Sequence, residues 1–302
     1  MPPEPLSYLQ SILLGFLQGL TEFLPVSSTA HMEIVPQLFG MRDPGAAFSA
    51  VVQLGPIVAI IAYFRNDLIR YVQGILRHPN PTKVLSGDLS DTDARLGWFT
   101  LIGTIPLAIF GVLLEKKIDT SFRNLYVTAA SLILLALVLL YAERAAKRNT
   151  PLEKITFPQA MNVGLAQVLA LIPGTSRSGV TITAGLLQGL DRESAARFSF
   201  LLSIPAITAA GVYKLFKVLK TTHLGGEAGP YLAGMIVAGI VAYVVIRWFL
   251  GYMKEHNTQV FVWYRIALGV LVLALLQTHF LHDQKPVEPT AANTVASVSA
   301  QR

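Results

Sequence analysis

Cysteine is absent from this 302-residue sequence, and charged residues are scarce. Without cysteine, disulfides and thiolate metal sites are excluded, and the redox compartment is left undetermined. Only 14% of the residues are charged and 53% are hydrophobic, with a mean hydropathy of +0.52. A chain this apolar cannot form one soluble core with a wettable surface. The composition therefore indicates a membrane protein.

Several common sequence signals are also missing. Residues 1–7 carry no basic n-region, and no A-x-A site follows the first apolar run, so we expect no cleaved signal peptide. No G-x-x-x-x-G-K-[ST] motif occurs, which disfavours nucleotide-powered transport. The net charge of +6 comes without a compact basic and aromatic module. We therefore expect contact with anionic lipids and no nucleic-acid binding.

Six apolar runs are each long enough to cross a hydrocarbon layer of about 30 Å, which takes roughly 20 helical residues. They cover about 46–64, 98–115, 122–142, 198–216, 230–250 and 260–282. The polar segment 78–95 is expected to be a loop, and 283–302, rich in Pro, Ala, Thr and Ser, a disordered tail. The sequence thus predicts an all-α polytopic membrane protein.

Two further apolar stretches, 7–24 and 158–172, are each followed by a proline, a group of Ser and Thr, and another short apolar run. Each piece is too short or too polar to span cleanly. We expect two re-entrant helical hairpins, because backbone broken at membrane depth needs protein or a water-filled cavity around it. Pro25 and Pro173 are expected to end the first helix of each hairpin, because proline lacks an N–H and disfavours α conformation in the preceding residue.

The two halves of the chain look like copies of each other. "GFLQGLTEFLPVSS" at 15–28 aligns with one gap to "GLAQVLALIPGTS" at 164–176. The alignment matches Gly15 to Gly164, Gln18 to Gln167, Pro25 to Pro173 and Ser28 to Ser176, and further on Pro56 falls opposite Pro205. Each half would hold one re-entrant hairpin and three transmembrane helices, so the second half starts on the opposite face. This predicts an inverted-topology repeat.

The repeats would cover about 7–142 and 156–282 of a single membrane domain, 1–282, with their two polar turns meeting near the midplane. Loops 65–97, 143–157, 191–197 and 247–265 hold fourteen Lys and Arg residues, and the opposite side holds nine. Positive residues concentrate in cytoplasmic loops, so we expect both termini outside. The face to which the pocket opens stays undetermined.

The first turn, "QGLTEFLPVSSTAH" at 18–31, places polar groups inside an apolar region. Gln18 and Glu22 are four residues apart and Ser28 and His31 are three apart, so each pair can share a helical face. An ionisable group at membrane depth costs about 2.5–3.5 kcal/mol on insertion scales, which makes Glu22 a functional candidate. Two structural alternatives stay open: Glu22 caps the second helix or pairs with His31, and His31 is a satisfied core residue.

The second turn, "PGTSRSGVT" at 173–181, carries an arginine between two apolar runs. Gly174 and Gly179 permit close backbone approach. Together with free N–H groups of the following helix, Arg177 makes an anion site suited to phosphate. The hydroxyls expected to bind phosphate are those of Ser27, Thr29, Thr175, Ser176, Ser178 and Thr181. The structural alternative is an Arg177–Glu22 ion pair that pins the hairpins together.

Brought together, the two turns would combine an anion clamp with a Glu, His and Ser set. Such a set suits phosphoryl transfer, in which positioning and charge neutralisation supply most of the catalysis. Ser28 or His31 could attack phosphorus, and the choice between them stays open. Glu22, with Gln18, could bind a divalent cation through oxygen or orient the base.

The motifs "LQGLTEFLPVSSTAH" and "PGTSRSG", in this order and about 150 residues apart, resemble those of the undecaprenyl pyrophosphate phosphatase family, also called the bacitracin resistance protein family. The resemblance covers about 7–282. It implies an enzyme of the bacterial inner membrane that hydrolyses a C55 polyprenyl pyrophosphate to the monophosphate. This reaction recycles the lipid carrier for cell-wall synthesis, with Mg²⁺ or Ca²⁺ assisting.

The resemblance also assigns residues. The family's first motif, Glu or Gln, three spacers and Glu, maps to Gln18 and Glu22, and the glutamine removes one carboxylate from a two-carboxylate metal site. The family's serine and histidine map to Ser28 and His31, and its arginine motif maps to Ser176, Arg177, Ser178 and Thr181. The other lipid phosphatase type, with Ser-Arg followed by a distant His and Asp, does not fit, because no histidine follows the arginine until His223.

An inverted repeat with broken helices is also a transporter architecture. The alternative function is therefore a carrier or flippase for an anionic lipid or a small anion. A transporter needs Arg177 and a counter-ion but has less use for the Ser, His and Glu set. Gly234 and Gly239 in the run 233–243 allow tight helix packing, and the sequence leaves a homodimer open.

Overall fold

The computed structural model describes residues 6–41, 44–86, 90–114, 124–221 and 228–283. Regular structure in these ranges is helical, apart from an isolated bridge between Thr150 and Leu190. The first half contains α1 (Tyr8–Thr21), α2 (Ser28–Leu38), α3 (Gly45–Val52), α4 (Leu54–Tyr63), α5 (Arg65–Arg77), α6 (Thr82–Leu85), α7 (Thr92–Leu113) and α9 (Leu125–Ala145). The second half contains η1 (Leu152–Lys154), α10 (Phe157–Ala166), η2 (Gln167–Leu171), α11 (Arg177–Leu187), α12 (Arg192–Thr221), α13 (Ala228–Glu255) and α14 (Gln259–Gln277). The tail predicted at 283–302 lies outside the described residues except for Asp283.

Five helices are long and apolar enough to cross a membrane: α7, α9, α12, α13 and α14. They coincide with five of the six predicted crossings. The remaining crossing, 46–64, is divided into α3 and α4, and the segment from Ala47 to Tyr63 is bent by 73° from α5. The protein is therefore a polytopic helical membrane protein, and its described residues hold five candidate spans, or six if the bent pair counts as one.

The segment 78–95, predicted as a loop, holds the short helix α6 and the start of α7. The Asp91 carboxylate accepts a hydrogen bond from the Ala94 N–H at 3.1 Å, and such an N-cap fixes the first turn of a helix. That bond, with help from the Arg77 guanidinium 2.9 Å away, holds the pKa of Asp91 below its ordinary value. The local cap explains why α7 begins at Thr92, well before the apolar run does.

Each of the two predicted hairpins is built from two short helices, α1 with α2, and α10 and η2 with α11. The first helix ends before its proline, at Thr21 in one hairpin and at Leu171 in the other. The following helices, α2 and α11, are capped by Ser27 and Ser176, which have positive φ angles of 73° and 68°. This shared backbone form corrects the alignment, because Ser27 and not Ser28 occupies the position that matches Ser176.

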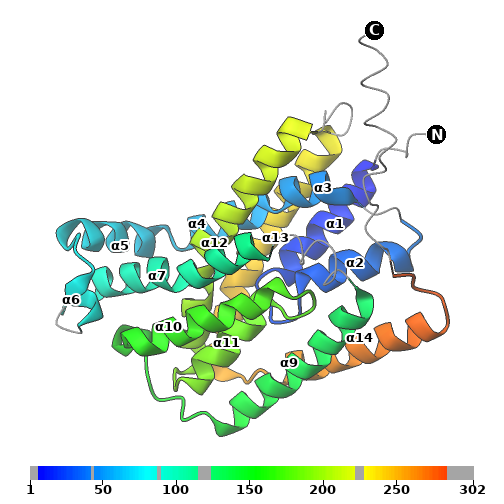
Figure 1. Cartoon of the computed structure of the whole chain (residues 1–302). Coiled ribbons are helices and arrows are strands. Elements are labelled where there is room, and N and C mark those ends of the chain that lie inside the picture. The colour runs from blue at the N-terminus through cyan, green and yellow to red at the C-terminus, as the bar shows by residue number, and fades with distance from the viewer. Residues whose placement is uncertain (1–5, 42–43, 87–89, 115–123, 222–227, 284–302) are drawn as a thin grey trace.

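Glycine contacts bring each hairpin against a helix of the other half of the chain. A Cβ atom on Gly15 of α1 would lie 2.1 Å from the Gly234 carbonyl oxygen of α13, and one on Gly164 of α10 would lie 2.3 Å from the Gly103 carbonyl oxygen of α7. Figure 1 shows α1 beside α13 and α10 beside α7. The tight packing expected of Gly234 therefore occurs within one chain.

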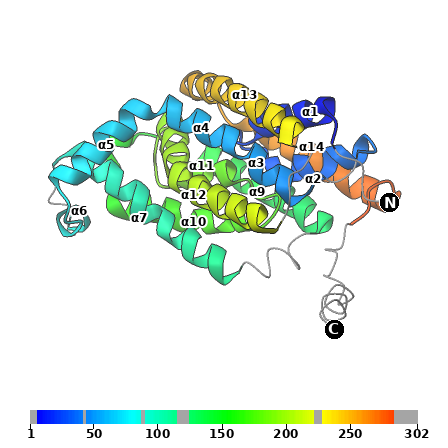
Figure 2. The same cartoon turned by 90° about the horizontal axis from the view of Figure 1, so that it is seen from above.

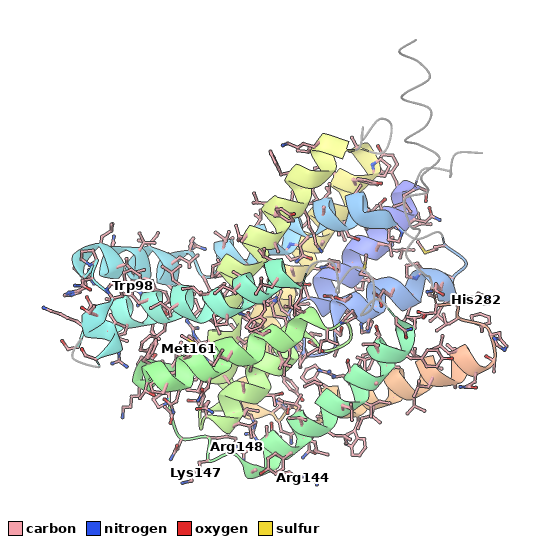
Figure 3. All side chains as sticks on the ribbon, in the orientation of Figure 1. Trp98, Arg144, Lys147, Arg148, Met161 and His282 are labelled. Carbon is pink, nitrogen blue, oxygen red and sulfur yellow. The ribbon has the colours of Figure 1, made fainter. Side chains whose placement is uncertain are left out.

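Helices α9 and α12 pack against the second hairpin. Figure 2 places α11 near the middle of the bundle, and its most extensive contacts are with α9, α10, η2 and α12. At the end of α9, the buried Glu143 carboxylate is bonded to Arg148, Arg192 and Thr258, which ties together the ends of α9, α12 and α14. Figure 3 shows Arg144, Lys147 and Arg148 gathered at this end of α9. The membrane orientation inferred from loop charge stays a prediction.

Candidate functional site

The two polar turns meet in the structure. Arg177 Nη2 donates to Glu22 Oε1 at 3.1 Å, so the ion pair considered from sequence is present. Both side chains are largely buried, with 13% and 9% of their surface exposed. Next to them, Ser178 Oγ donates to the Leu24 carbonyl oxygen at 2.8 Å. The Arg177–Glu22 contact joins residues 155 positions apart in the sequence, one from each hairpin.

Glu22 is the centre of this cluster. Its second oxygen, Oε2, accepts hydrogen bonds from Ser28 Oγ at 2.8 Å and from Gln18 Nε2 at 3.0 Å. The Ser28 hydroxyl therefore directs its proton at a carboxylate that an arginine holds in place. A hydroxyl in hydrogen-bond reach of a base, with a third group orienting that base, is the arrangement of an activated nucleophile.

The Gln18 amide faces Glu22 with its nitrogen. Nε2 also donates to Gln53 Oε1 at 2.8 Å, which leaves the Gln18 oxygen directed away from the carboxylate. Within the described ranges, no group of three His, Asp or Glu residues could hold a metal ion. A cation shared between one carboxylate and substrate phosphate oxygens fits this donor set, because Mg²⁺ is commonly bound in that way.

His31 is directed to Tyr264 and the backbone. Its Nδ1 lies 2.7 Å from the Ser27 carbonyl oxygen, which can only accept, so Nδ1 carries the proton in the neutral ring. Nε2 then accepts from the Tyr264 hydroxyl at 2.6 Å, and the two rings are parallel with centroids 5.7 Å apart. The Glu22–His31 pair considered from sequence is not the arrangement found. His31 is a satisfied, buried residue beside the serine turn.

Most of the hydroxyls expected to bind phosphate have structural partners. Ser27 and Ser176 cap their helices, Ser178 bonds the Leu24 carbonyl, Thr181 bonds Ser199 Oγ at 2.6 Å, and Thr29 lies exposed on α2. Of the described side-chain atoms that are buried without a hydrogen-bond partner, two belong to the second turn: Thr175 Oγ1 and Arg177 Nη1. Buried polar atoms are nearly always hydrogen-bonded, so these two donors beside the N-terminus of α11 suit an anion.

Three residues of the site were missed from the sequence: Gln53, Tyr264 and Arg265. Arg265 was counted among loop charges, but it lies within α14 and is fully buried. Removing it leaves thirteen positive residues on the side predicted to be cytoplasmic. Its position inside the apolar run 260–282 was a usable signal, because a charge at membrane depth is a functional candidate by the same criterion that selected Glu22.

The fold and the site together define a polytopic membrane protein with a buried polar centre built from two broken helices. Residues 11–271 match the family model described as bacitracin resistance protein BacA. The chain therefore belongs to the bacitracin resistance protein BacA family.

Relatives from distant bacteria carry a common name. The chain is 48% identical over 286 residues to the undecaprenyl-diphosphatase of Myxococcus xanthus, with 94% of each chain covered. It is 47% identical over 280 residues to the undecaprenyl-diphosphatase of Chloroherpeton thalassium, covering 89% of this chain and 96% of that one. The protein of the same name from Renibacterium salmoninarum is 44% identical over 274 residues, covering 90% and 96%.

Proposed function

We propose that this protein is an undecaprenyl-diphosphatase, which hydrolyses undecaprenyl pyrophosphate to undecaprenyl phosphate and inorganic phosphate and so recycles the lipid carrier for cell-wall synthesis. Family membership and the shared name of its relatives support this function. The observation that carries the proposal is the hydrogen bond from Ser28 Oγ to Glu22 Oε2, with Arg177 bound to the other carboxylate oxygen. This arrangement favours Ser28 over His31 as the nucleophile.

In the proposed reaction, Ser28 Oγ attacks the terminal phosphorus and its proton passes to Glu22 Oε2. The bond from the terminal phosphorus to the bridging oxygen breaks, and undecaprenyl phosphate leaves with the bridging oxygen and the proton from Glu22. A water molecule then attacks the phosphoserine while Glu22 accepts one of its protons. The bond from phosphorus to Ser28 Oγ breaks, Glu22 returns that proton to Oγ, inorganic phosphate is released, and both Ser28 and the Glu22 carboxylate are restored. A base within hydrogen-bond reach of the hydroxyl supports both steps.

Two hydrogen-bond donors of the second turn are proposed to bind the transferred phosphate. Arg177 Nη1 and Thr175 Oγ1 are buried without partners, so an anion would complete their hydrogen bonding. Helices α2 and α11 both begin at the site, and the N-terminus of a helix favours negative charge. His31, bonded to the Ser27 carbonyl, is proposed to hold the backbone turn that carries Ser28.

A divalent cation, Mg²⁺ or Ca²⁺, is proposed to be shared between Glu22 and the substrate phosphates. When bound, such an ion would neutralise negative charge on the pyrophosphate. Gln18 would act from the other side, holding Glu22 through its Nε2 donor.

An inverted repeat in the bacterial inner membrane is proposed as the architecture. Two observations support it: the matching positive-φ serines at the starts of α2 and α11, and the reciprocal glycine contacts of each hairpin with the other half. Termini outside the cell remain the orientation that loop charge favours. Single cysteines introduced at Lys147 and at His282 would give opposite accessibility to a membrane-impermeant thiol reagent, with Lys147 protected in intact cells.

The function is tested by phosphate release from undecaprenyl pyrophosphate, using the purified full chain in detergent with Mg²⁺ or Ca²⁺. Wild type is compared with Glu22→Ala, His31→Ala and Arg177→Ala. We expect release by wild type, near-complete loss in the Glu22 and Arg177 variants, and a smaller loss for His31→Ala. No release by the folded wild type, together with exchange of lipid phosphate across a bilayer, would favour the transporter. Full activity in all three variants would refute the site.

A further inference from the structure

Arg265 has no part in the chemistry proposed above, yet it is the largest fully buried side chain in the described part of the protein. It projects from α14 to backbone carbonyls of three segments. Nη2 donates to the Thr175 and Gly174 oxygens at 2.9 and 3.2 Å, and Nη1 donates to the Pro25 oxygen at 3.4 Å. The guanidinium also bonds Ser131 and Leu132 of α9. One side chain thus touches both polar turns.

The charge of Arg265 has no acidic partner among the described residues: its hydrogen bonds run to carbonyl oxygens, and the ion pairs found there do not include it. Arg177 is neutralised by Glu22, so that pair adds no net charge to the site. Carbonyl dipoles compensate a buried cation only in part, and an isolated buried charge is strongly unfavourable. A negative ligand bound beside the two turns would supply the counter-charge that Arg265 lacks among the described residues.

Arg265 also holds strained backbone. Ser176 has a φ of 68°, and a non-glycine residue persists in this region only where its surroundings over-determine it. The two carbonyls before Ser176, those of Gly174 and Thr175, are the ones that Arg265 Nη2 binds. The planar fork of arginine suits two acceptors at once, whereas a lysine ammonium is a single point charge on a flexible stem.

We infer that Arg265 is a positioning residue that fixes the two catalytic turns relative to each other and gives the site its uncompensated positive charge for pyrophosphate. This inference rests on the proposed function. Arg265 has two separable roles in it, one in the geometry of the turns and one in the charge of the site. The geometric role affects kcat, because Ser28 and Arg177 lie on different turns. The electrostatic role affects KM and the inhibition constant of the product, inorganic phosphate.

The test measures kcat, KM and inhibition by inorganic phosphate for Arg265→Gln, Arg265→Lys and the matched control Arg247→Gln, which removes an exposed arginine from α13. For Arg265→Gln we expect KM and the phosphate inhibition constant to rise on the order of tenfold, because one nearby charge is lost, and kcat to fall. Arg265→Lys should restore KM and phosphate inhibition while kcat stays low. The control should match wild type.

A second variant covers the case in which Arg265→Gln does not fold. A Cβ atom on Gly179 would lie 2.5 Å from Arg265 Nη1 and 3.1 Å from Ser176 Cβ. Gly179→Ala therefore displaces the guanidinium, with its charge intact, from the turn that it holds. We expect kcat to fall with little change in phosphate inhibition, whereas Gly111→Ala, whose nearest contact is 3.9 Å, should be neutral. Wild-type kinetics in folded Arg265→Gln, or in Gly179→Ala if Arg265→Gln is unfolded, would overturn the inference. Absence of phosphate release by wild type would instead refute the proposed function.

Discussion

Replacing Glu22 by glutamine isolates its role as a base. The amide keeps an oxygen that can accept from Arg177, now 3.1 Å from the carboxylate, so packing of the turns is largely preserved. It cannot take the proton that Ser28 Oγ presents at 2.8 Å. General-base catalysis contributes about 10²–10⁴-fold to rates, equivalent to about 3–5 kcal/mol of barrier. We expect kcat for phosphate release to fall by a factor in this range.

A double-mutant cycle with Ser28→Ala sharpens this prediction. If Glu22 acts through Ser28, the double variant should be no slower than the slower single variant, because residues that act as a unit are non-additive. Independent contributions would instead multiply. Glu193→Gln serves as the control, since it removes a surface carboxylate paired with Lys254 at 3.3 Å. Retention of more than a tenth of wild-type kcat in Glu22→Gln, or multiplicative losses in the cycle, would refute the Ser28–Glu22 mechanism.

Three further predictions address packing and support of the site. Gly15→Ala should lower the free energy of unfolding by about 1–3 kcal/mol, because the added methyl group overpacks against Gly234. Thermal unfolding in detergent measures the change, with Gly251→Ala as a control whose Cβ meets no atom within 4 Å. Equal stabilities of the two variants would contradict the close contact. Tyr264→Phe removes the hydroxyl that donates to His31 Nε2. It should lower kcat about 3–10-fold, in line with the loss of one hydrogen bond of about 1 kcal/mol. An unchanged kcat would show that the site does not depend on the hydrogen bond from Tyr264 to His31. Glu143→Gln should destabilise the protein by about 3–5 kcal/mol, because the carboxylate is only 2% exposed and is bonded to Arg148, Arg192 and Thr258. A thermal unfolding midpoint equal to that of wild type would refute this prediction.

The long spans and the core of the site could be predicted from sequence. Five of the six expected crossings coincide with helices long and apolar enough to span, because about twenty apolar residues in a row leave few alternatives to such a helix. Glu22, Ser28 and Arg177 stand out in the sequence because polar residues at membrane depth are conspicuous. The structure brings the three side chains together, and their catalytic roles stay a prediction. The Arg177–Glu22 contact is the structural alternative that the sequence left open once the internal repeat suggested two paired hairpins.

The parts that escaped prediction depend on tertiary contacts. The division of 46–64 into α3 and α4 and the sharp bend before α5 leave no plain mark in hydropathy. Gln53, at the junction of α3 and α4, gains its role only because α4 and α1 both pack on α13, which brings it to Gln18. Likewise, no local sequence pattern indicates that His31 contacts Tyr264, a residue 233 positions away in the sequence.

The reciprocal glycine contacts have a consequence for biosynthesis. α1 leaves the ribosome early but packs on α13, and α10 packs back on α7, so each half encloses part of the other. The first hairpin therefore cannot complete its packing until nearly the whole chain has entered the bilayer, and its polar turn stays uncovered until then. Arg265 on α14 completes the site later still. Assembly of the centre is thus tied to completion of the polypeptide, and a chain released before α14 would be inserted in the membrane without an organised site.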